Sequence, residues 1–493
     1  MFSTKEGRVE SIETVPDTEN DPIKQPYYIT NSHTAMNENK VQELQDVVIR
    51  FSGDSGDGMQ LTGTLFSDTS ALLGNGISTF PDYPAEIRAP QGTVAGVSGF
   101  QVHFGAKRQL NPGDFCDVLI AMNPAALKAN RKWLKPGATV ILDEDSITEE
   151  HLRKAGFATL DPIRELNLED FNVVVPNITE MTKAALADSG LDNKAMVKCK
   201  NMFALGICFY LYNRPEDHAK HYLDSKFAKK NPAIAEANKR AIDAGYNYAA
   251  NTHQFANTYT VASGQMEKGT YRSISGNVAT AWGLCAASEK SGLPLFCGSY
   301  PITPATVILE ELAKRKDLGV KTVQAEDEIA GICTAIGASF AGNFAVTTTS
   351  GPGLSLKSEA LGLAVMTELP LVVVDVQRGG PSTGLPTKTE QSDLQQALYG
   401  RNGESPVAVI AASMPSDCFH YAFEAGRIAM EHMTPVVLLS DGFIANGSEP
   451  WKIPSMKDYP TINPPIIDKT EDGGPFMPYA RNEKLARSWA FPG

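Results

Sequence analysis

The sequence LPLFCGSYPITP (residues 293–304) is the first of four segments in the second half of the chain that share one kind of pattern. The others are VQAEDEIAG (323–331), TTTSGPG (347–353) and LVVVDVQRGG (371–380). Three of the four are apolar runs that end in a turn rich in Gly, Pro or Thr, and VQAEDEIAG is an acidic cluster that begins a helix of small and apolar residues. In parallel α/β sheets, ligands bind at the carboxyl ends of the strands. We therefore expect the four segments to line one crevice.

The composition excludes several classes of protein. The chain has 493 residues and a formal net charge of −13 at pH 7, and its length suits about two to four domains. The negative charge argues against nucleic acid or an anionic membrane as the main partner. No apolar run is as long as a membrane span, and no secretory signal is visible at the start of the sequence. These features predict a cytoplasmic protein.

The seven cysteines are scattered and none forms a C-x-x-C pair, and the eight histidines show no ligand spacing. An odd set that lies mostly in apolar segments is typical of reduced, buried thiols. We therefore expect this chain to hold no metal ion and no iron–sulfur cluster of its own.

Repeated strand–turn–helix patterns predict an α/β fold with two domains, each built on a mainly parallel sheet. The expected boundaries are 1–44 for a disordered extension, 45–245 for the first domain, 246–273 for a linker, 274–449 for the second domain and 450–493 for a linker into a further, missing domain. Within the first domain, Leu134–Gly137 is predicted to form a turn between two strands.

A Gly-rich turn, SGDSGDG (residues 52–58), lies between a predicted strand at Val47–Phe51 and a predicted helix at Met59–Leu73. This order is the layout of phosphate-binding βα units. The dinucleotide fingerprint fails at Leu61, where a glycine is required, and the lysine of a P-loop is also missing. Two interpretations stay open: glycines that permit a tight turn and close helix packing, or a cradle for an anionic ligand.

Four motifs connect the second domain with a known family: YPITP (300–304), EDE (326–328), GPG (351–353) and RGGPSTGLPT (378–387). Together they resemble the α subunit of the 2-oxoacid:ferredoxin oxidoreductases. The first domain looks like the family's γ subunit, through its Gly-rich turn and the later PAEIRAP (84–90). A γ domain fused ahead of α is similar to the 2-oxoglutarate-type enzymes.

The resemblance implies that the second domain has a thiamine-diphosphate-binding fold of the pyrimidine type. It also implies a separate β subunit that supplies the Mg²⁺–diphosphate site and a [4Fe–4S] cluster. Gly56-Asp57-Gly58 looks like the start of the diphosphate motif of thiamine enzymes, but the required asparagine is missing, which agrees with that division.

The implied reaction is the CoA-dependent oxidative decarboxylation of 2-oxoglutarate to succinyl-CoA, with electrons passed to ferredoxin. The chain would be active only with its β subunit, in an αβ or (αβ)₂ assembly. Pyruvate or a branched-chain 2-oxoacid is an alternative substrate, and a non-catalytic scaffold subunit is an alternative function.

Glu328 is the expected catalytic carboxylate against the aminopyrimidine ring of thiamine diphosphate. A proton shared there favours the tautomer that deprotonates the thiazolium ring. Glu326 is the nearest rival, and the alternative is that both are acidic residues favoured by the dipole of the helix that follows. Gly351, Pro352 and Gly353 are expected to let the backbone approach the cofactor, with a plain tight turn as the alternative.

Arg378 is the expected partner of the substrate carboxylate, because a guanidinium makes two parallel hydrogen bonds to a carboxylate. The alternative is a surface arginine at a strand end. Lys388 and Arg401 are candidates for a second substrate carboxylate, although lone basic residues in loops are usually solvated.

Thr303 is expected to cap a helix whose first residue is Pro304, and the resemblance adds a contact between its hydroxyl and the substrate. The resemblance also places Tyr300 and Ile302 in the wall of the substrate pocket. For these two residues, plain packing at a strand end is an equal alternative.

Overall fold

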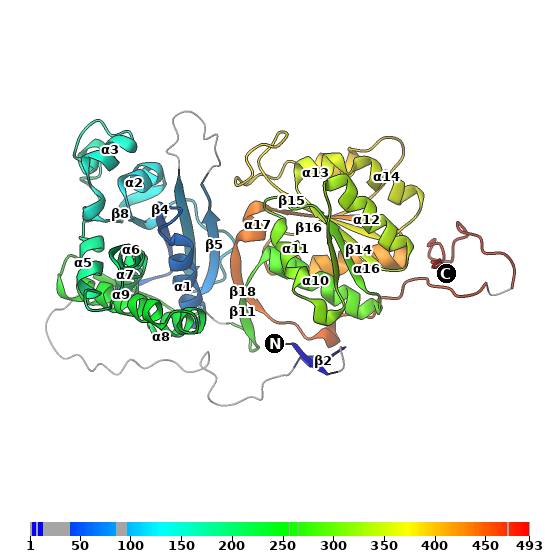
Figure 1. Cartoon of the computed structure of the whole chain (residues 1–493), viewed down its shortest axis with the longest axis horizontal. Coiled ribbons are helices and arrows are strands. Elements are labelled where there is room, and N and C mark those ends of the chain that lie inside the picture. The colour runs from blue at the N-terminus through cyan, green and yellow to red at the C-terminus, as the bar shows by residue number, and fades with distance from the viewer. Residues whose placement is uncertain are drawn as a thin grey trace. The chain divides into compact units, whose positions relative to one another are not determined.

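The alternating strand and helix patterns of the sequence fold as two separate α/β units (Figure 1). The computed structural model describes residues 2–5, 8–12, 40–84, 96–255, 257–264, 266–470 and 473–492. One unit comprises residues 17–268, and the other comprises residues 269–493 together with residues 1–16. The predicted class, two α/β domains with mainly parallel sheets, is confirmed.

The described residues of the 17–268 unit form a six-stranded sheet in the order β5-β6-β4-β7-β8-β9. The strands are β4 (Asp46–Asp54), β5 (Gly76–Asp82), β6 (Val97–Gly105), β7 (Cys116–Ala121), β8 (Leu134–Leu142) and β9 (Asn172–Val174). The pairs β4–β7, β7–β8 and β8–β9 are parallel, whereas β6 runs antiparallel to both β4 and β5. Leu134–Gly137 lies within β8, so the turn predicted there is wrong.

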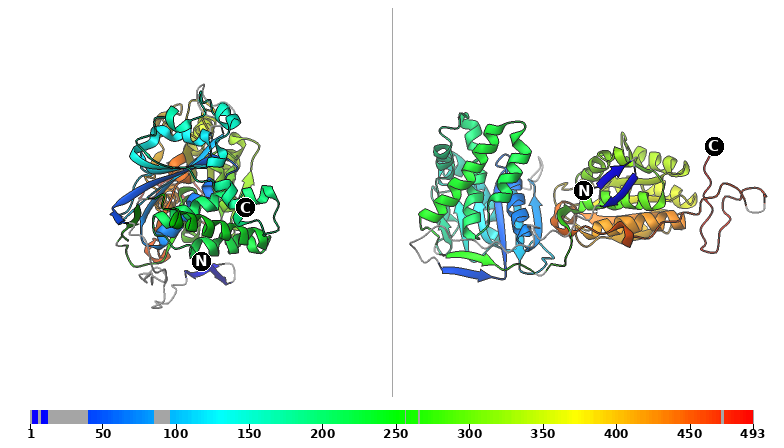
Figure 2. Two further views of the ribbon diagram at one scale, coloured as in Figure 1. Left: turned by 90° about the vertical axis from the view of Figure 1, so that its left-hand side faces the viewer. Right: turned by 90° about the horizontal axis from the view of Figure 1, so that it is seen from below.

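Helices cover both faces of this sheet. On one face lie α1 (Met59–Leu72), α7 (Lys200–Leu211) and α9 (Pro232–Asn251), and α2 (Pro124–Asn130) packs on the other. The long helices α7 and α9 run side by side (Figure 2). Two glycines permit this approach, because a Cβ at Gly206 would lie 2.1 Å from Ile242 O and a Cβ at Gly245 would lie 1.9 Å from Phe203 O.

The remaining elements of this unit include parts of the predicted extension and linker. They are β3 (Lys40–Leu44), α3 (Glu149–Lys154), α4 (Pro162–Glu165), α5 (Ile178–Ala185), α6 (Asn193–Val197), α8 (Asp217–Leu223) and β10 (Asn257–Val261). β3 and β10 pair in parallel, and α9 continues to Asn251. Strands β1 (Phe2–Lys5) and β2 (Arg8–Ile12) also lie inside the predicted extension, whose other residues before Lys40 are outside the described ranges.

In the 269–493 unit, the described residues form a parallel sheet in the order β13-β12-β14-β15-β17-β16. The strands are β12 (Leu295–Ser299), β13 (Lys321–Gln324), β14 (Phe344–Thr349), β15 (Leu371–Gln377), β16 (Ala408–Ala411) and β17 (Pro435–Asp441). Because β13 lies on one side of β12 and β14 on the other, the chain reverses its direction across the sheet there. Such a reversal opens a crevice at the carboxyl ends of the two strands.

Two groups of helices enclose this sheet (Figure 1). One face packs against α12 (Glu328–Phe340), α13 (Gly351–Leu356), α14 (Ser358–Met366) and α15 (Leu394–Tyr399). The other packs against α10 (Gly276–Ser291), α11 (Thr306–Ala313) and α16 (Asp417–His432), while α17 (Gly442–Asn446) follows β17. Alternate residues of β15 serve the two faces: Val373 packs in the first group, and Val372 and Val374 pack in the second.

Parts of the segment predicted to be a linker, 450–493, pack on this unit. Strand β18 (Ser448–Lys452) pairs antiparallel with β11 (Tyr271–Ser275). Further along, Ile462 and Trp489 are buried in the same apolar core as α10 and α16. None of the helices in the described ranges combines the length and hydropathy needed to cross a membrane.

Candidate functional site

Glu328 is the first residue of α12, and this helix start lies at the carboxyl ends of β12 and β14, where a crevice is expected. Asp327 caps this helix, because its side-chain oxygen accepts a hydrogen bond from Ala330 N over 2.7 Å. The cap fixes the first turn of α12, and Glu328 is only half-buried in that turn. Glu326 lies in the turn before the helix and is exposed. Of the two candidate carboxylates, Glu328 is the one that the helix holds in place.

Gly353 lies directly beneath the Glu328 side chain, in the first turn of α13. A Cβ at Gly353 would stand 2.8 Å from Glu328 Cγ, 3.4 Å from its Oε1 and 2.0 Å from Thr349 Oγ1. Any side chain at this position would therefore displace Glu328. The GPG motif forms the start of a helix, with Pro352 in its first turn, so it is not a plain turn.

The Glu328–Gly353 arrangement fits an aminopyrimidine ring. A carboxylate that is partly open to the crevice can hold a proton against a ring nitrogen, and the missing side chain of Gly353 leaves the backbone free for close approach. A side chain at Gly351 is excluded by a different neighbour, because a Cβ there would lie 2.7 Å from Asp393 Oδ2. Each glycine of the motif thus leaves space for the side chain of a different acidic residue, Glu328 in one case and Asp393 in the other.

Arg378 directly follows β15, and its side chain connects the loop that contains Thr303 with the loop that contains Thr383. Its Nη1 donates to Thr303 O over 2.7 Å and its Nη2 donates to Thr383 O over 3.0 Å. The side chain is largely buried, with 7% of the residue exposed. Arg378 and Thr303, predicted from separate motifs, therefore lie in contact. The interpretation of Arg378 as a surface arginine is wrong.

Thr303 does not cap a helix, so that prediction is wrong. Helix α11 begins at Thr306, with Ala305 at the cap position and no side-chain cap. The local Thr-Pro pattern is overridden by tertiary bonds, because Asn277 Nδ2 donates to Pro304 O over 2.9 Å and Arg378 binds Thr303 O. The backbone of Thr303 thus serves to hold Arg378.

The other candidate residues differ in how the structure uses them. Tyr300 is 37% exposed, and Ile302 is half-buried against the core. Lys388 O accepts from Gly379 N over 2.8 Å, which folds the loop back beside Arg378. Arg401 donates to Ala397 O over 2.8 Å and to Ser405 O over 3.0 Å, so its guanidinium fixes the end of α15.

Lys357 is a residue of the site that the sequence analysis missed. It is fully buried between α13 and α14, and its Nζ donates to Glu328 O over 2.6 Å. Burial lowers the pKa of Lys357 to about 8, although the negative charges of Glu328 and Asp327 act in the opposite direction. The available signal was one lysine in the apolar helical segment GLSLKSEALGLAV (353–365).

A buried pair of carboxyl groups, Asp375 of β15 and Asp393 before α15, was also missed. Burial raises the pKa of Asp375 well above the ordinary carboxyl range, and the neighbouring Asp393 raises it further. Burial likewise raises the pKa of Asp393, whose backbone N donates to Gln377 Oε1 over 3.0 Å. Two neighbouring carboxyl groups that are removed from water do not readily both ionise, so we expect the pair to keep one proton at neutral pH. The signal was an aspartate inside the apolar run VVVDV (372–376).

The unit at 17–268 has its own cavity, of about 710 Å³, at the carboxyl ends of β4 and β7. Four basic side chains are among those that line it: Lys128, His151, Lys154 and Lys200. The Gly-rich turn contributes Asp54 and Asp57, and Lys200 Nζ lies 3.2 Å from Asp57 Oδ1. In the same turn, Gly58 adopts the left-handed conformation with φ of 73°. Both interpretations of the turn therefore stay open, since it is tight and also borders a basic cavity.

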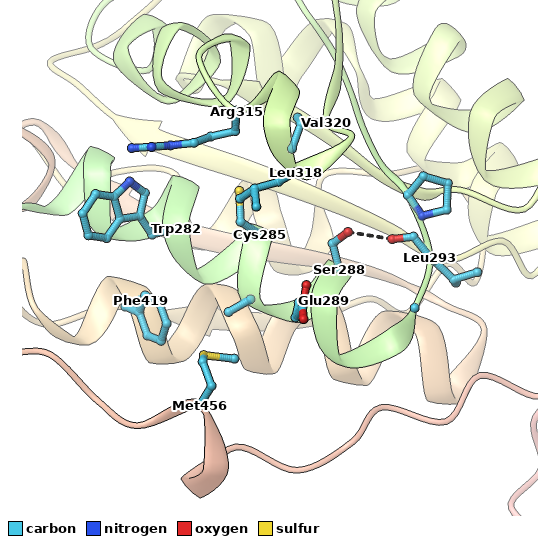
Figure 3. Close-up of a pocket in the computed structure, with 13 residues that line it drawn as sticks. Trp282, Cys285, Ser288, Glu289, Leu293, Arg315, Leu318, Val320, Phe419 and Met456 are labelled. Atoms are coloured by element: carbon cyan, nitrogen blue, oxygen red, sulfur yellow. Dashed lines mark hydrogen bonds between the residues drawn. The ribbon is translucent and has the colours of Figure 1, made fainter. Parts of the chain in front are cut away.

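The 269–493 unit also has a cavity of about 550 Å³, whose lining residues are drawn in Figure 3. Its wall includes Leu293 and Pro294, which immediately precede β12, and Val320, which precedes β13. It is therefore located at the amino ends of the strands. Trp282 and Phe419 make the rest of its wall largely apolar. None of the residues predicted to carry the chemistry lines it.

A family model described as "Pyruvate flavodoxin/ferredoxin oxidoreductase, thiamine diP-bdg" matches residues 289–491. A second, described as "Pyruvate ferredoxin/flavodoxin oxidoreductase", matches residues 48–248. The 269–493 unit is therefore a thiamine-diphosphate-binding domain of the kind found in oxidoreductases that use ferredoxin or flavodoxin.

Individual relatives cover both units. The 2-oxoglutarate oxidoreductase subunit KorA of Mycobacterium tuberculosis is 55% identical over 92% of this chain and 69% of its own length. Subunit alpha of 2-oxoacid:ferredoxin oxidoreductase 1 from Aeropyrum pernix is 27% identical over 90% of this chain and 72% of its own. The structure of 2-oxoglutarate:ferredoxin oxidoreductase from Magnetococcus marinus, with 2-oxoglutarate, coenzyme A and succinyl-CoA bound, matches with a TM-score of 0.76. That structure is 33% identical and covers 91% of this chain and 72% of its own. The chain belongs to the 2-oxoacid:ferredoxin oxidoreductase family.

Proposed function

We propose that this chain is the α subunit, with a fused γ domain, of an enzyme that oxidatively decarboxylates 2-oxoglutarate to succinyl-CoA and passes electrons to ferredoxin. One observation carries the proposal: the Glu328 carboxylate lies over the bare backbone of Gly353, at the crevice of a thiamine-diphosphate-binding domain. The substrate is supported by the M. tuberculosis relative, which is a 2-oxoglutarate oxidoreductase subunit.

Glu328 is assigned the proton at the aminopyrimidine ring. Bound thiamine diphosphate supplies a carbon nucleophile and an electron sink for decarboxylation. The chain's own contribution is to place one carboxylate at a fixed point, by the Asp327 cap from one side and the Gly353 backbone from below. A proton held in that position by a rigid helix start is a general acid–base device.

Arg378 and Thr303 are assigned to the substrate carboxylate. A guanidinium offers several donors in one plane, so Arg378 can bind a carboxylate while it keeps its bond to Thr303 O. Tyr300 and Ile302 are assigned to the wall beside them, because they precede Thr303 in the same loop. Lys388, in the loop that folds back beside Arg378, is assigned to the second carboxylate of 2-oxoglutarate.

A β subunit is the proposed partner, and it would supply Mg²⁺, the diphosphate site and a [4Fe–4S] cluster in an αβ or (αβ)₂ assembly. The exposed apolar face of α12 and α14 supports an interface of this kind. On it, Ile329 is 49% exposed, Phe340 56%, Leu363 44% and Met366 70%. Exposed apolar side chains on two neighbouring helices are typical of an interaction surface. Ferredoxin is the proposed electron acceptor and the cytoplasm the proposed location.

Coenzyme A is the proposed ligand of the cavity in the 17–268 unit. The M. marinus structure has coenzyme A bound, and three lysines that can bind phosphate groups, Lys128, Lys154 and Lys200, line this cavity beside Asp54 and Asp57. Replacing Lys154 by Gln should raise KM for CoA several-fold and leave KM for 2-oxoglutarate unchanged. Lys183→Gln, in the same unit outside the cavity, should change neither value.

The test of the main proposal is a steady-state assay of the chain purified with a candidate β subunit. We expect reduction of a viologen dye that requires both 2-oxoglutarate and CoA, that is slow with pyruvate, and that Arg378→Ala abolishes. Faster reduction with pyruvate or a branched-chain 2-oxoacid would keep the reaction and change the substrate. A stable complex that binds thiamine diphosphate and contains an intact cluster, yet turns over no 2-oxoacid, would make this chain a scaffold subunit.

A further inference from the structure

Lys357 combines complete burial with a direct contact to the helix that presents Glu328. No part of the residue is exposed, and its Nζ lies 2.6 Å from Glu328 O. Lysine is almost never fully buried unless its charge is paired, because moving an ammonium out of water is costly. This buried charge is held against the residue that carries the chemistry.

Lys357 lies between the last residue of α13 and the first residue of α14, and it connects them to α12 through its side chain. Its own backbone N donates to Gly353 O over 3.0 Å. One residue therefore binds the glycine beneath Glu328 through its backbone and the carbonyl of Glu328 through its side chain. Because Lys357 is fully buried, it cannot reach a ligand in the crevice.

We propose that Lys357 is a positioning residue: its ammonium fixes the first turn of α12 and so holds the Glu328 carboxylate over Gly353. This inference deepens the proposed function and rests on the assignment of Glu328. Small displacements of a catalytic group are costly, and a misplacement of about 1 Å lowers the rate roughly 100-fold. A buried point charge at a helix start is well suited to prevent such displacement.

The groups that face the ammonium come from two elements. Glu328, Asp327 and Cys333 belong to α12 or its cap, and Cys297 belongs to β12. Burial lowers the pKa of Lys357 to about 8. The charge that holds α12 is therefore lost as the pH rises past that value, and we expect kcat of the wild-type complex to fall on the alkaline side.

The first test replaces Lys357 by Met, which has a similar length and no charge. We expect kcat of the complex with its β subunit to fall roughly 100-fold, and the alkaline fall in kcat near pH 8 to disappear. The melting temperature at pH 7 should stay level or rise, because an apolar replacement of a buried charge is often neutral or stabilising. The control is Lys314→Met, which replaces an exposed lysine directly after α11. It should leave kcat, the pH dependence of kcat and the melting temperature unchanged. A lower melting temperature with unchanged kcat would give Lys357 a structural role only.

A double-mutant cycle tests whether Lys357 acts through Glu328. In a chain that already carries Glu328→Gln, adding Lys357→Met should change kcat, and the affinity for thiamine diphosphate, by less than about threefold, because coupled residues are not additive. Equal losses in both backgrounds would overturn the inference. The affinity is read from quenching of tryptophan fluorescence in the same complex, so this arm decides the matter even if no 2-oxoacid is turned over and the proposed function fails.

The buried charge can also be measured without any ligand. Between pH 8 and about 10.4, the ordinary lysine pKa, the unfolded chain binds a proton that the folded chain has released, so stability rises with pH. The melting temperature of the wild type should therefore rise relative to that of Lys357→Met across this window. A constant difference would show that Lys357 is not a buried titrating group.

Discussion

At the scale of the residue, Glu328 is held by what surrounds it. The carboxylate is set by the Asp327 cap, the Lys357 ammonium and the missing side chain of Gly353. The functional position of a single carboxylate thus depends on a helix cap, a buried charge and a glycine from three different segments.

Gly353→Ala tests this packing. The added Cβ would lie 2.8 Å from Glu328 Cγ and 2.0 Å from Thr349 Oγ1, so both side chains must move. We expect weaker binding of thiamine diphosphate and a kcat lowered about 100-fold, in line with a displacement of about 1 Å. The measurements are the affinity for the cofactor and the dye-reduction rate of the complex.

The matched control is Gly337→Ala, on the same helix as Glu328. No atom lies within 4 Å of the Cβ it would add, and alanine favours a helix over glycine by about 0.5–1 kcal/mol. The melting temperature should therefore rise, and kcat should stay the same at saturating β subunit, because Gly337 lies three residues before Phe340 of the proposed partner surface. An equal loss of activity in both variants would contradict the role given to Gly353.

The Asp375–Asp393 pair predicts how stability depends on pH. The folded chain keeps a proton on Asp375 that the unfolded chain releases above the ordinary carboxyl pKa of about 4. Its contribution to stability is therefore lost as the pH rises toward the raised pKa. Asp375→Asn, which needs no proton, should gain melting temperature relative to the wild type between pH 5 and pH 8. The control is Asp170→Asn, at an exposed aspartate, and its melting temperature should change with pH as that of the wild type does. If the melting temperature of Asp375→Asn also changed in parallel with that of the wild type, the retained proton would be contradicted.

At the scale of the element, α12 has to begin at the right residue. Its cap bond, from Ala330 N to Asp327 Oδ1, measures 2.7 Å. Helix α6 has an equivalent cap in the other unit, where Ala195 N donates to Asp192 Oδ1 over 2.7 Å. The two caps allow stability and function to be separated.

Asp327→Ala and Asp192→Ala should each lower the free energy of unfolding of their own unit by about 1 kcal/mol. Only Asp327→Ala should also lower kcat, by tenfold or more, because it releases the turn that carries Glu328. Chemical denaturation gives the first quantity and the dye assay the second. Loss of kcat in both variants would attribute the effect to general destabilisation.

The elements themselves could largely be predicted from sequence. Apolar runs bounded by Gly, Pro and Asn identified β4, β7, β12, β14 and β15, because buried parallel strands are apolar on both faces. The direction of β6 could not be predicted, since an alternating pattern is the same for parallel and antiparallel pairing. The prediction that Thr303 caps a helix was wrong, because Asn277 and Arg378, both distant in sequence, bind the backbone there.

At the scale of the whole molecule, the two units divide the tasks: one presents Glu328 and Arg378, and the other contains the basic cavity. Local motifs predicted two domains and a set of site residues, and the structure brings Glu328 beside Gly353 and Arg378 against Thr303. It could not reveal Lys357 or Asp375 as parts of the site, because what makes them unusual is burial by segments far along the chain.

Met366→Glu tests the partner surface on α12 and α14. The side chain is 70% exposed in the isolated chain, so a charge there should leave folding intact. We expect it to weaken co-purification with the β subunit at least tenfold, because a charge within an apolar interface must lose its water. Leu160→Glu, at a leucine of the other unit that is 68% exposed, is the control and should co-purify normally. Normal co-purification of Met366→Glu would place the interface elsewhere.

The shared proton of Asp375 also changes how the folded molecule moves in an electric field. The formal charge of −13 counts every aspartate as ionised, whereas a carboxyl pair that keeps one proton makes the folded chain one charge less negative. Asp375→Asn then removes a charge only from the unfolded chain. The folded variant should co-migrate with the wild type in native electrophoresis at pH 7, while the two separate by isoelectric focusing in urea.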